Sequence, residues 1–227
     1  MWQKLIHLVV IPLLFVVVSA VVSVVVVKNV DPVDVSKYET VSGDYAYVTS
    51  PYDAMFQRVG GEYNIDWLLL SAIARTESQY KFDAVSKVGA VGLMQIMPAV
   101  ARRMGYERDH LFDAEVSVRV ASELLIGNNK MLNLRSNFDK TERIRFILAC
   151  YNAGYSRIAD ARRLARYYNE DANQWSVVAT YLQRLAEPEY AEHEAVQAGV
   201  FTGSAETIAY VNRVIHIYKL YQERIFL

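Results

Sequence analysis

The sequence predicts a mainly α-helical domain that extends over residues 51–227. From Pro51 onward, apolar residues recur at the three- and four-residue spacing of helices. Aspartates that can cap a helix precede several of these segments, at positions 66, 113 and 139, and the connections between segments are short. Such a pattern does not indicate a β-rich fold.

The first clear helix follows Asp66, whose carboxylate can accept a hydrogen bond from an unpaired amide of the first turn. Apolar residues within 69–74 keep helical spacing, and the helix is expected to end near Gln79. Glu77 therefore lies at its carboxyl end, beside a loop that contains two glycines within 86–92. This places one carboxyl group against a segment that can turn back on it.

Later helices are marked by their first residues. Pro98 suits the first turn of a short helix, and Asp113 can cap a long helix that runs through residues 124–134. Asp139 and Glu142 have the spacing of a capping box. The remaining expected elements are a helix at 144–153 closed by Gly154, helices at 156–168 and 174–186 with Pro188 after the second, an acidic loop at 187–203, and an amphipathic helix at 205–221.

The amino-terminal segment is strongly apolar. Residues 5–27 contain no charged side chain, and about 23 residues suffice to cross a hydrocarbon core of roughly 30 Å. Lys4 and the small residues at 18–20 are also compatible with a cleaved signal sequence, but the apolar run continues past that cleavage site. We therefore predict a transmembrane anchor at residues 1–28, with a signal sequence as the alternative, and a linker at 29–50.

Composition excludes several classes of function. The formal net charge of −1 gives no long-range attraction to nucleic acid. The single Cys150 cannot form an intrachain disulfide. The four histidines stand far apart in the sequence without a metal-binding motif, so we expect neither a metal site nor a cofactor.

Glu77 is the candidate for acid chemistry. If the loop after it folds back, apolar side chains between residues 88 and 97 surround its carboxyl group. Removal from water disfavours the charged form and raises the pKa of a carboxyl group toward neutrality. Such a group can donate a proton to a leaving oxygen. The alternative interpretation is a solvated glutamate at a helix end.

Four ordered motifs carry a resemblance to a known family. They are ES at residues 77–78, GAVGLMQIMP at 89–98, ACYNAG at 149–154 and ETIAYV at 206–211. Together they resemble the family 1, or soluble-type (SLT domain), lytic transglycosylases of the lysozyme-like superfamily, over roughly residues 51–221. The resemblance implies a helical lysozyme-like domain. It also implies cleavage of peptidoglycan between N-acetylmuramic acid and N-acetylglucosamine, with formation of a 1,6-anhydromuramic end.

The resemblance also assigns roles to individual residues. Glu77 matches the family's single general acid and base, which suffices because the C6 hydroxyl of the sugar replaces water as the nucleophile. The expected substrate-binding residues are Ser86 at the N-acetyl group, Gln95 and Met97 along the sugar sites, Tyr151 near the catalytic carboxyl, and Glu206 and Tyr210 in the groove. For each of these six, a purely structural role is the alternative.

Two other functions compete with this interpretation. A goose-type lysozyme of the same superfamily cuts the same bond with water and needs a further carboxylate or an ordered water, for which Asp83 is the nearest candidate in sequence. A membrane protein that binds peptidoglycan without cleaving it would not need Glu77. Asn152 is expected to stabilise its own turn.

The predicted anchor and linker suggest an enzyme held in the inner membrane by a single span, with its catalytic domain in the periplasm and glycan strands as its partner. Secretion after signal cleavage is the alternative. A partner in assembly of the cell envelope is left open. The choice between internal and terminal cleavage of strands is open too, since it depends on whether loops such as 187–203 close the groove.

Overall fold

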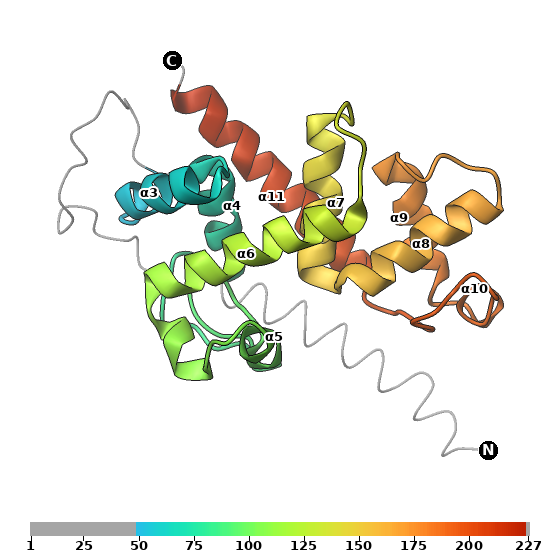
Figure 1. Ribbon diagram of the computed structural model, residues 1–227, viewed down its shortest axis with the longest axis horizontal. Helices are drawn as coiled ribbons and strands as arrows, with labels where there is room; N and C mark the ends of the chain where they lie inside the picture. Colours follow the sequence, from blue (N-terminus) through green and yellow to red (C-terminus); the bar gives the residue numbers. More distant parts are fainter. Residues whose placement is uncertain (1–48, 226–227) are drawn as a thin grey trace. The chain divides into compact units, whose positions relative to one another are not determined.

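The structure, a computed structural model, describes residues 49–225 and is mainly helical, as predicted (Figure 1). Strand pairing in this part of the chain is limited to two isolated bridges, between Val85 and Val91 and between Val91 and Ile96. The helices are α3 (Asp53–Tyr63), α4 (Trp67–Ser78), α5 (Pro98–Arg103), the 3₁₀ helix η3 (Arg108–Phe112), α6 (Ala114–Leu132), α7 (Lys140–Ala153), α8 (Tyr155–Tyr167), α9 (Trp175–Arg184), α10 (Pro188–Ala191) and α11 (Ser204–Ile225).

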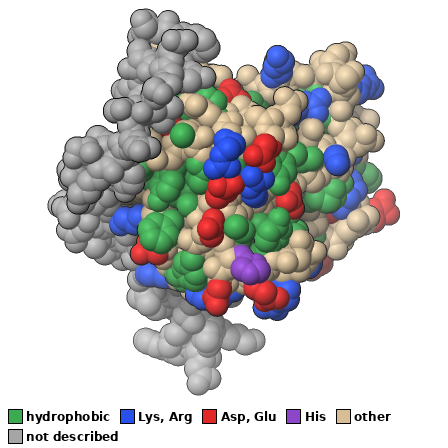
Figure 2. All heavy atoms as spheres, turned by 60° about the vertical axis from the view of Figure 1, so that its left-hand side comes forward, with side chains coloured by type: hydrophobic (Ala, Val, Ile, Leu, Met, Phe, Trp, Pro, Cys, Tyr) green, Lys and Arg blue, Asp and Glu red, His purple; other side chains and the backbone are tan. Residues whose placement is uncertain are grey.

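The predicted anchor at residues 1–28 lies outside the described residues. Within residues 49–225, no helix has both the length and the apolar character needed to cross a membrane. On the face drawn in Figure 2, acidic and basic side chains lie side by side among apolar ones.

The predicted helix caps are confirmed. Asp66 accepts a hydrogen bond from the Leu68 amide at 3.0 Å, and Asp113 and Asp139 do the same for the third amide of α6 and α7 at 2.9 and 2.8 Å. The expected capping box at α7 is only half formed, because the Glu142 carboxylate accepts a hydrogen bond from the Trp175 amide at 2.5 Å. That bond joins α7 to the start of α9 instead of closing α7 on itself.

The segment 187–203 differs from the prediction of a continuous loop. Pro188 fixes the first turn of the short helix α10, and the backbone carbonyl of Glu187 accepts hydrogen bonds from the Tyr190 and Ala191 amides. The final helix is also longer than predicted and continues to Ile225. The local signal for α10 was thus Pro188 itself, which the sequence analysis had used only to end the preceding helix.

Helix α4 contributes much of the core, since residues 68–74 are all buried. It packs against α3 on one side and α11 on another, and α11 also contacts α7 and α9. A chain of hydrogen-bonded hydroxyl groups crosses this core. The hydroxyl oxygen of Tyr80 lies 2.9 Å from that of Ser71 and 2.9 Å from that of Tyr221. The carboxyl end of α4 is thereby held at a fixed position next to α11.

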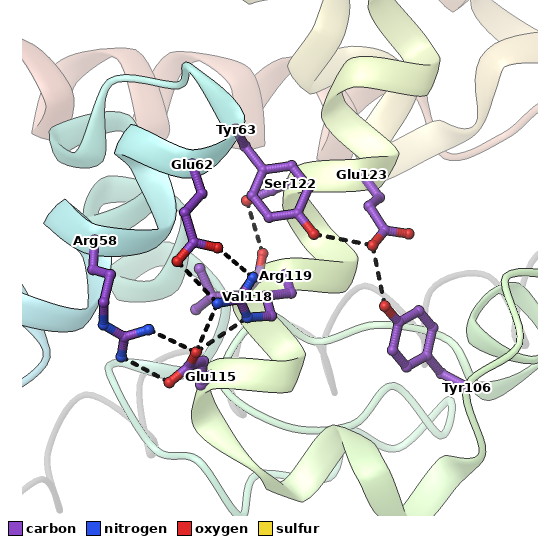
Figure 3. A network of polar contacts seen from close by, with 9 residues as sticks. All are labelled: Arg58, Glu62, Tyr63, Tyr106, Glu115, Val118, Arg119, Ser122 and Glu123. Atoms are coloured by element: carbon purple, nitrogen blue, oxygen red, sulfur yellow. Dashed lines mark hydrogen bonds and ion pairs between the residues drawn. The ribbon is translucent and has the colours of Figure 1, made fainter.

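A charged network joins α3 to α6 (Figure 3). Arg58 binds Glu115 at 2.7 Å, and Arg119 binds Glu62 at 2.6 Å and Glu115 at 2.9 Å. Hydrogen bonds from the two guanidinium groups lower the pKa of Glu115 to about 2. Because these groups are exposed to solvent, we assign the network to the alignment of α3 with α6 and not to a large gain in stability.

The loop between α4 and α5 folds back on itself, as predicted. Val91 and Ile96 exchange two backbone hydrogen bonds of 3.0 Å, and the Gly92 amide donates to the Ala84 carbonyl at 2.8 Å. Gly92 adopts a φ of +81°, and a Cβ atom there would lie 2.0 Å from the carbonyl oxygen of Leu111. The turn thus requires glycine for its conformation and for its contact with η3.

Replacing Gly92 with alanine should destabilise the protein far more than the same change at Gly89. Both glycines have positive φ, but a Cβ atom at Gly89 meets nothing within 4 Å. We expect G89A to lower the free energy of unfolding by about 1 kcal/mol and G92A by about 3 kcal/mol or more, measured by urea denaturation. Equal losses in the two variants would contradict the close contact with Leu111.

Candidate active site

A cavity of about 810 Å³ opens beside the carboxyl end of α4. Its walls come from the loop between α4 and α5, from α5, from the carboxyl half of α6, from the junction of α7 and α8, and from the first half of α11. Ligand cavities in proteins typically measure about 300–1,000 Å³, so this one can take more than a single small group. Glu77 of α4 is one of the residues that line it.

The Glu77 carboxyl group lies in a largely apolar environment. Leu93 and Met94 of the returning loop are fully buried next to the end of α4, and the Ser78 hydroxyl donates to the Leu93 carbonyl at 2.8 Å. Burial raises the pKa of Glu77 to about 8, an effect that Tyr210 and Arg213 oppose and Glu206 reinforces. With this pKa the side chain is mostly protonated at neutral pH, whereas the sequence had left a solvated glutamate as the alternative.

Tyr151 of α7 stands next to Glu77, but its hydroxyl group is already engaged. It donates a hydrogen bond to the Met94 carbonyl at 2.7 Å, which ties α7 to the loop. Burial, reinforced by the nearby Glu77 charge, raises the pKa of Tyr151 well above its usual value. Because its hydroxyl donates to the Met94 carbonyl, Tyr151 supports the loop that covers Glu77.

Tyr210 of α11 is placed differently. Its side chain is only 3% exposed, and within residues 49–225 its hydroxyl group meets no partner with the geometry of a regular hydrogen bond. The hydroxyl faces Glu77, whose charge adds to burial in raising the pKa of Tyr210 well above its usual value. A buried donor of this kind is available to the Glu77 carboxylate or to a bound ligand.

The other predicted residues also line the cavity. The Ser86 hydroxyl accepts a hydrogen bond from the Ala90 amide at 2.9 Å, and the Gln95 amide group donates to the Ala84 and Gly92 carbonyls at 3.1 and 2.9 Å. Both side chains thus brace the loop as well as facing the cavity. Met97 is exposed at the rim, and Glu206 lies in the exposed first turn of α11.

Arg213 is a cavity residue that the sequence analysis did not single out. It follows Glu206 and Tyr210 by seven and three positions, which places the three on one face of α11. This helical spacing from Glu206 and Tyr210 could have identified Arg213 from the sequence. Asn152, expected to stabilise its own turn, accepts a hydrogen bond from the Thr207 hydroxyl at 2.8 Å and so links the end of α7 to α11.

Asp83 does not line the cavity, and its side chain is exposed. Among the described residues, the carboxylate that shares the cavity with Glu77 is Glu206. Glu206 acts on Glu77 through its charge, by raising the Glu77 pKa. The cavity thus contains one carboxyl group in an apolar setting and one in an exposed setting.

Comparison with known proteins gives a consistent result. The family model described as Transglycosylase SLT domain matches residues 54–181. The membrane-bound lytic murein transglycosylase F of Pasteurella multocida is 33% identical over 184 residues, which are 78% of this chain and 36% of that protein. The protein of the same name from Yersinia enterocolitica is 36% identical over 143 residues, 63% of this chain and 28% of its own length.

Solved structures show the same fold. The 70 kDa soluble lytic transglycosylase of Escherichia coli matches with a TM-score of 0.50 and 24% identity, over 77% of this chain and 25% of that one. The complex of the 70 kDa soluble lytic transglycosylase with bulgecin A matches with a TM-score of 0.52 and 22% identity, over 76% and 24%. This chain thus spans roughly a quarter to two fifths of the relatives it matches.

Replacing Glu77 with glutamine should change stability in a pH-dependent way. With a folded pKa near 8 and an ordinary unfolded value, Glu77 favours the folded state fully below about pH 4.5, and this contribution disappears as pH rises through 8. We expect E77Q to be more stable than the wild type by about 1–3 kcal/mol above pH 8, with the difference shrinking on the acid side. Chemical denaturation from pH 4 to 9 measures this, and a difference independent of pH would contradict the raised pKa.

Proposed function

Because this chain belongs to the transglycosylase SLT domain family, we propose that it is a peptidoglycan lytic transglycosylase. It cleaves the β-1,4 bond between N-acetylmuramic acid and N-acetylglucosamine and leaves a 1,6-anhydromuramic end. The observation that carries this proposal is a single carboxyl group, that of Glu77, with a pKa near 8 in a cavity where its neighbouring carboxylate is exposed. Such a group can serve as an acid and, once deprotonated, as a base.

The reaction follows from that one group. Glu77 donates its proton to the glycosidic oxygen as the bond from that oxygen to C1 of N-acetylmuramic acid breaks, and N-acetylglucosamine leaves with a C4 hydroxyl. The C6 hydroxyl of the same muramic acid attacks C1, and the Glu77 carboxylate takes its proton. No water is consumed, and Glu77 returns to its protonated state. The Tyr210 hydroxyl can donate to the carboxylate form between the two steps.

The remaining cavity residues are proposed to hold the substrate. Ser86 faces the N-acetyl group, Gln95 and Met97 line the sugar sites, and Glu206 offers oxygens to sugar hydroxyls or amides. Tyr151 stays near the catalytic carboxyl but acts through its hydrogen bond to the Met94 carbonyl. Tyr151 is therefore not proposed to donate a hydrogen bond to charge that develops on the substrate, because its hydroxyl already donates to the Met94 carbonyl.

A hydrolytic mechanism fits the cavity less well. A lysozyme-type hydrolase of this superfamily needs a further carboxylate or an ordered water close to the acid. Asp83 lies outside the cavity, and the carboxylate that does line it, Glu206, is exposed on the first turn of α11. A protein that only binds peptidoglycan has no need for a buried carboxyl group with a raised pKa. Both alternatives are decided by the sugars released.

The proposed location follows from the amino-terminal sequence. Residues 1–28 would anchor the chain in the inner membrane, residues 29–50 would form a linker, and residues 51–227 would form the catalytic domain in the periplasm. The two transglycosylases F compared above are named membrane-bound, which supports this placement. Its partner is then the glycan strand within reach of the linker.

The first test is the chemistry of the released sugars. Incubated with purified peptidoglycan, the protein should release muropeptides that are one water lighter than the reducing forms, as detected by mass spectrometry. E77Q should release them about 10²–10⁴-fold more slowly. Reducing ends from the wild type would contradict the proposed chemistry and favour the hydrolase.

The second test separates the two tyrosines. Removing the Tyr210 hydroxyl removes a group that lowers the Glu77 pKa, so Y210F should shift the alkaline limb of kcat/KM to higher pH. Y151F removes the bond to the Met94 carbonyl and should lower stability by about 1 kcal/mol. An unshifted limb in Y210F would contradict the donor role of that hydroxyl.

A further inference from the structure

The acidic segment after α9 does not belong to the cavity. Within the described chain, the cavity is lined by residues up to Ser156 and again from Glu206 onward, and residues 187–203 contribute nothing to it. This segment is nevertheless the long connection that leads into α11, whose first turn carries Glu206. A lid over the groove would be built from such a connection, so its position decides how a strand can enter.

A buried carboxylate holds this segment against α8. Asp160 has no exposed surface, and its two oxygens accept hydrogen bonds from the Gln197 and Ala198 amides at 2.9 and 2.8 Å. Arg163 binds the same carboxylate and also donates to the Ala195 carbonyl at 2.8 Å. Because breaking these bonds would leave a buried charge unpaired, the contacts fix the segment in place.

Further contacts fix the end of the segment. Arg157 of α8 donates to the Ala198 and Gly199 carbonyls at 2.5 and 2.9 Å, and its guanidinium lies 5.5 Å from the centre of the Phe201 ring. The Phe201 amide donates to the Leu185 carbonyl at the end of α9 at 2.9 Å. Residues 195–201 are therefore bound to α8 and α9, outside the set of residues that line the cavity.

The rim of the cavity is open to solvent. Val88, Met97 and Met131, which come from the loop and from α6, line the cavity and are 76%, 41% and 49% exposed. Arg103 and Arg213, on α5 and α11, line it too and are exposed. These side chains stay largely exposed among residues 49–225, so the groove can be reached from the side.

We infer that the substrate is an uninterrupted glycan strand that enters the groove sideways, and that the protein cuts internal bonds instead of releasing disaccharides from strand ends. This inference rests on the proposed lytic activity. A wall that closes one end of the groove would restrict cleavage to strand ends, and residues 195–201 do not form one, because they are bound to α8 and α9 and contribute nothing to the cavity lining. Glu77 can therefore meet a bond anywhere along the strand.

The product lengths test the inference directly. The full chain in detergent is given long glycan strands without cross-links, and early products are separated by size and analysed by mass spectrometry. We expect long fragments with anhydro ends to appear first, while free disaccharides stay a minor fraction. Anhydro-disaccharides from the first time point, beside strands of unchanged length, would overturn internal cutting and leave the lytic chemistry intact. Long fragments with reducing ends would support the open groove but overturn the chemistry, and no products would overturn both.

The fixed position of the segment has its own test. The Gln197 and Ala198 amides should exchange hydrogen slowly in the wild type. R157A, which loses two bonds to carbonyl oxygens, should raise exchange across residues 197–201 about tenfold. The matched control is R166A, because Arg166 is an exposed arginine on the same helix, and it should leave exchange unchanged. Exchange in the wild type as fast as in an exposed loop would contradict the fixed position of the segment on α8 and α9.

Discussion

The carboxyl group of Glu77 is largely buried by a loop that folds back on the helix bearing it, while Glu77 still lines the cavity. The loop is tied to α4 through the bond from Ser78 to the Leu93 carbonyl, to α6 through the bond from the Met94 amide to Ser117 at 3.2 Å, and to α7 through Tyr151. If the loop moves away from α4, the carboxyl group becomes more hydrated, and its pKa shifts toward the ordinary value.

The polar side chains of the cavity surround Glu77. Tyr151 and Tyr210 come from helices far apart in the sequence, and both rings are brought to Glu77 because α4, α7 and α11 pack together. One hydroxyl is committed to the loop and the other is available, so two residues of the same type have different roles. Glu206 and Arg213 adjust the Glu77 pKa in opposite directions from the exposed face of α11.

The sequence located most of the longer helices and seven of the residues that line the cavity, because caps such as Asp66 and Asp113 act locally and the motifs fix positions along the chain. It could not find what depends on distant contacts. The Tyr151 hydroxyl donates a hydrogen bond to a backbone carbonyl 57 residues away. The Asp160 carboxylate accepts hydrogen bonds from amides 37 and 38 residues away. Neither leaves a local pattern. The Glu142 carboxylate shows the same limit, since its capping-box spacing was real but its partner is Trp175.

Burial, reinforced by the charge of Glu206, keeps Glu77 protonated at neutral pH in the free protein. The most direct measurement is the titration of that carboxyl group, followed by carbon NMR on protein labelled at glutamate side chains, with E77Q used to assign the signal. A midpoint near pH 8 is the result the structure predicts. A midpoint near pH 4.5 would show a solvated carboxylate and would contradict the account.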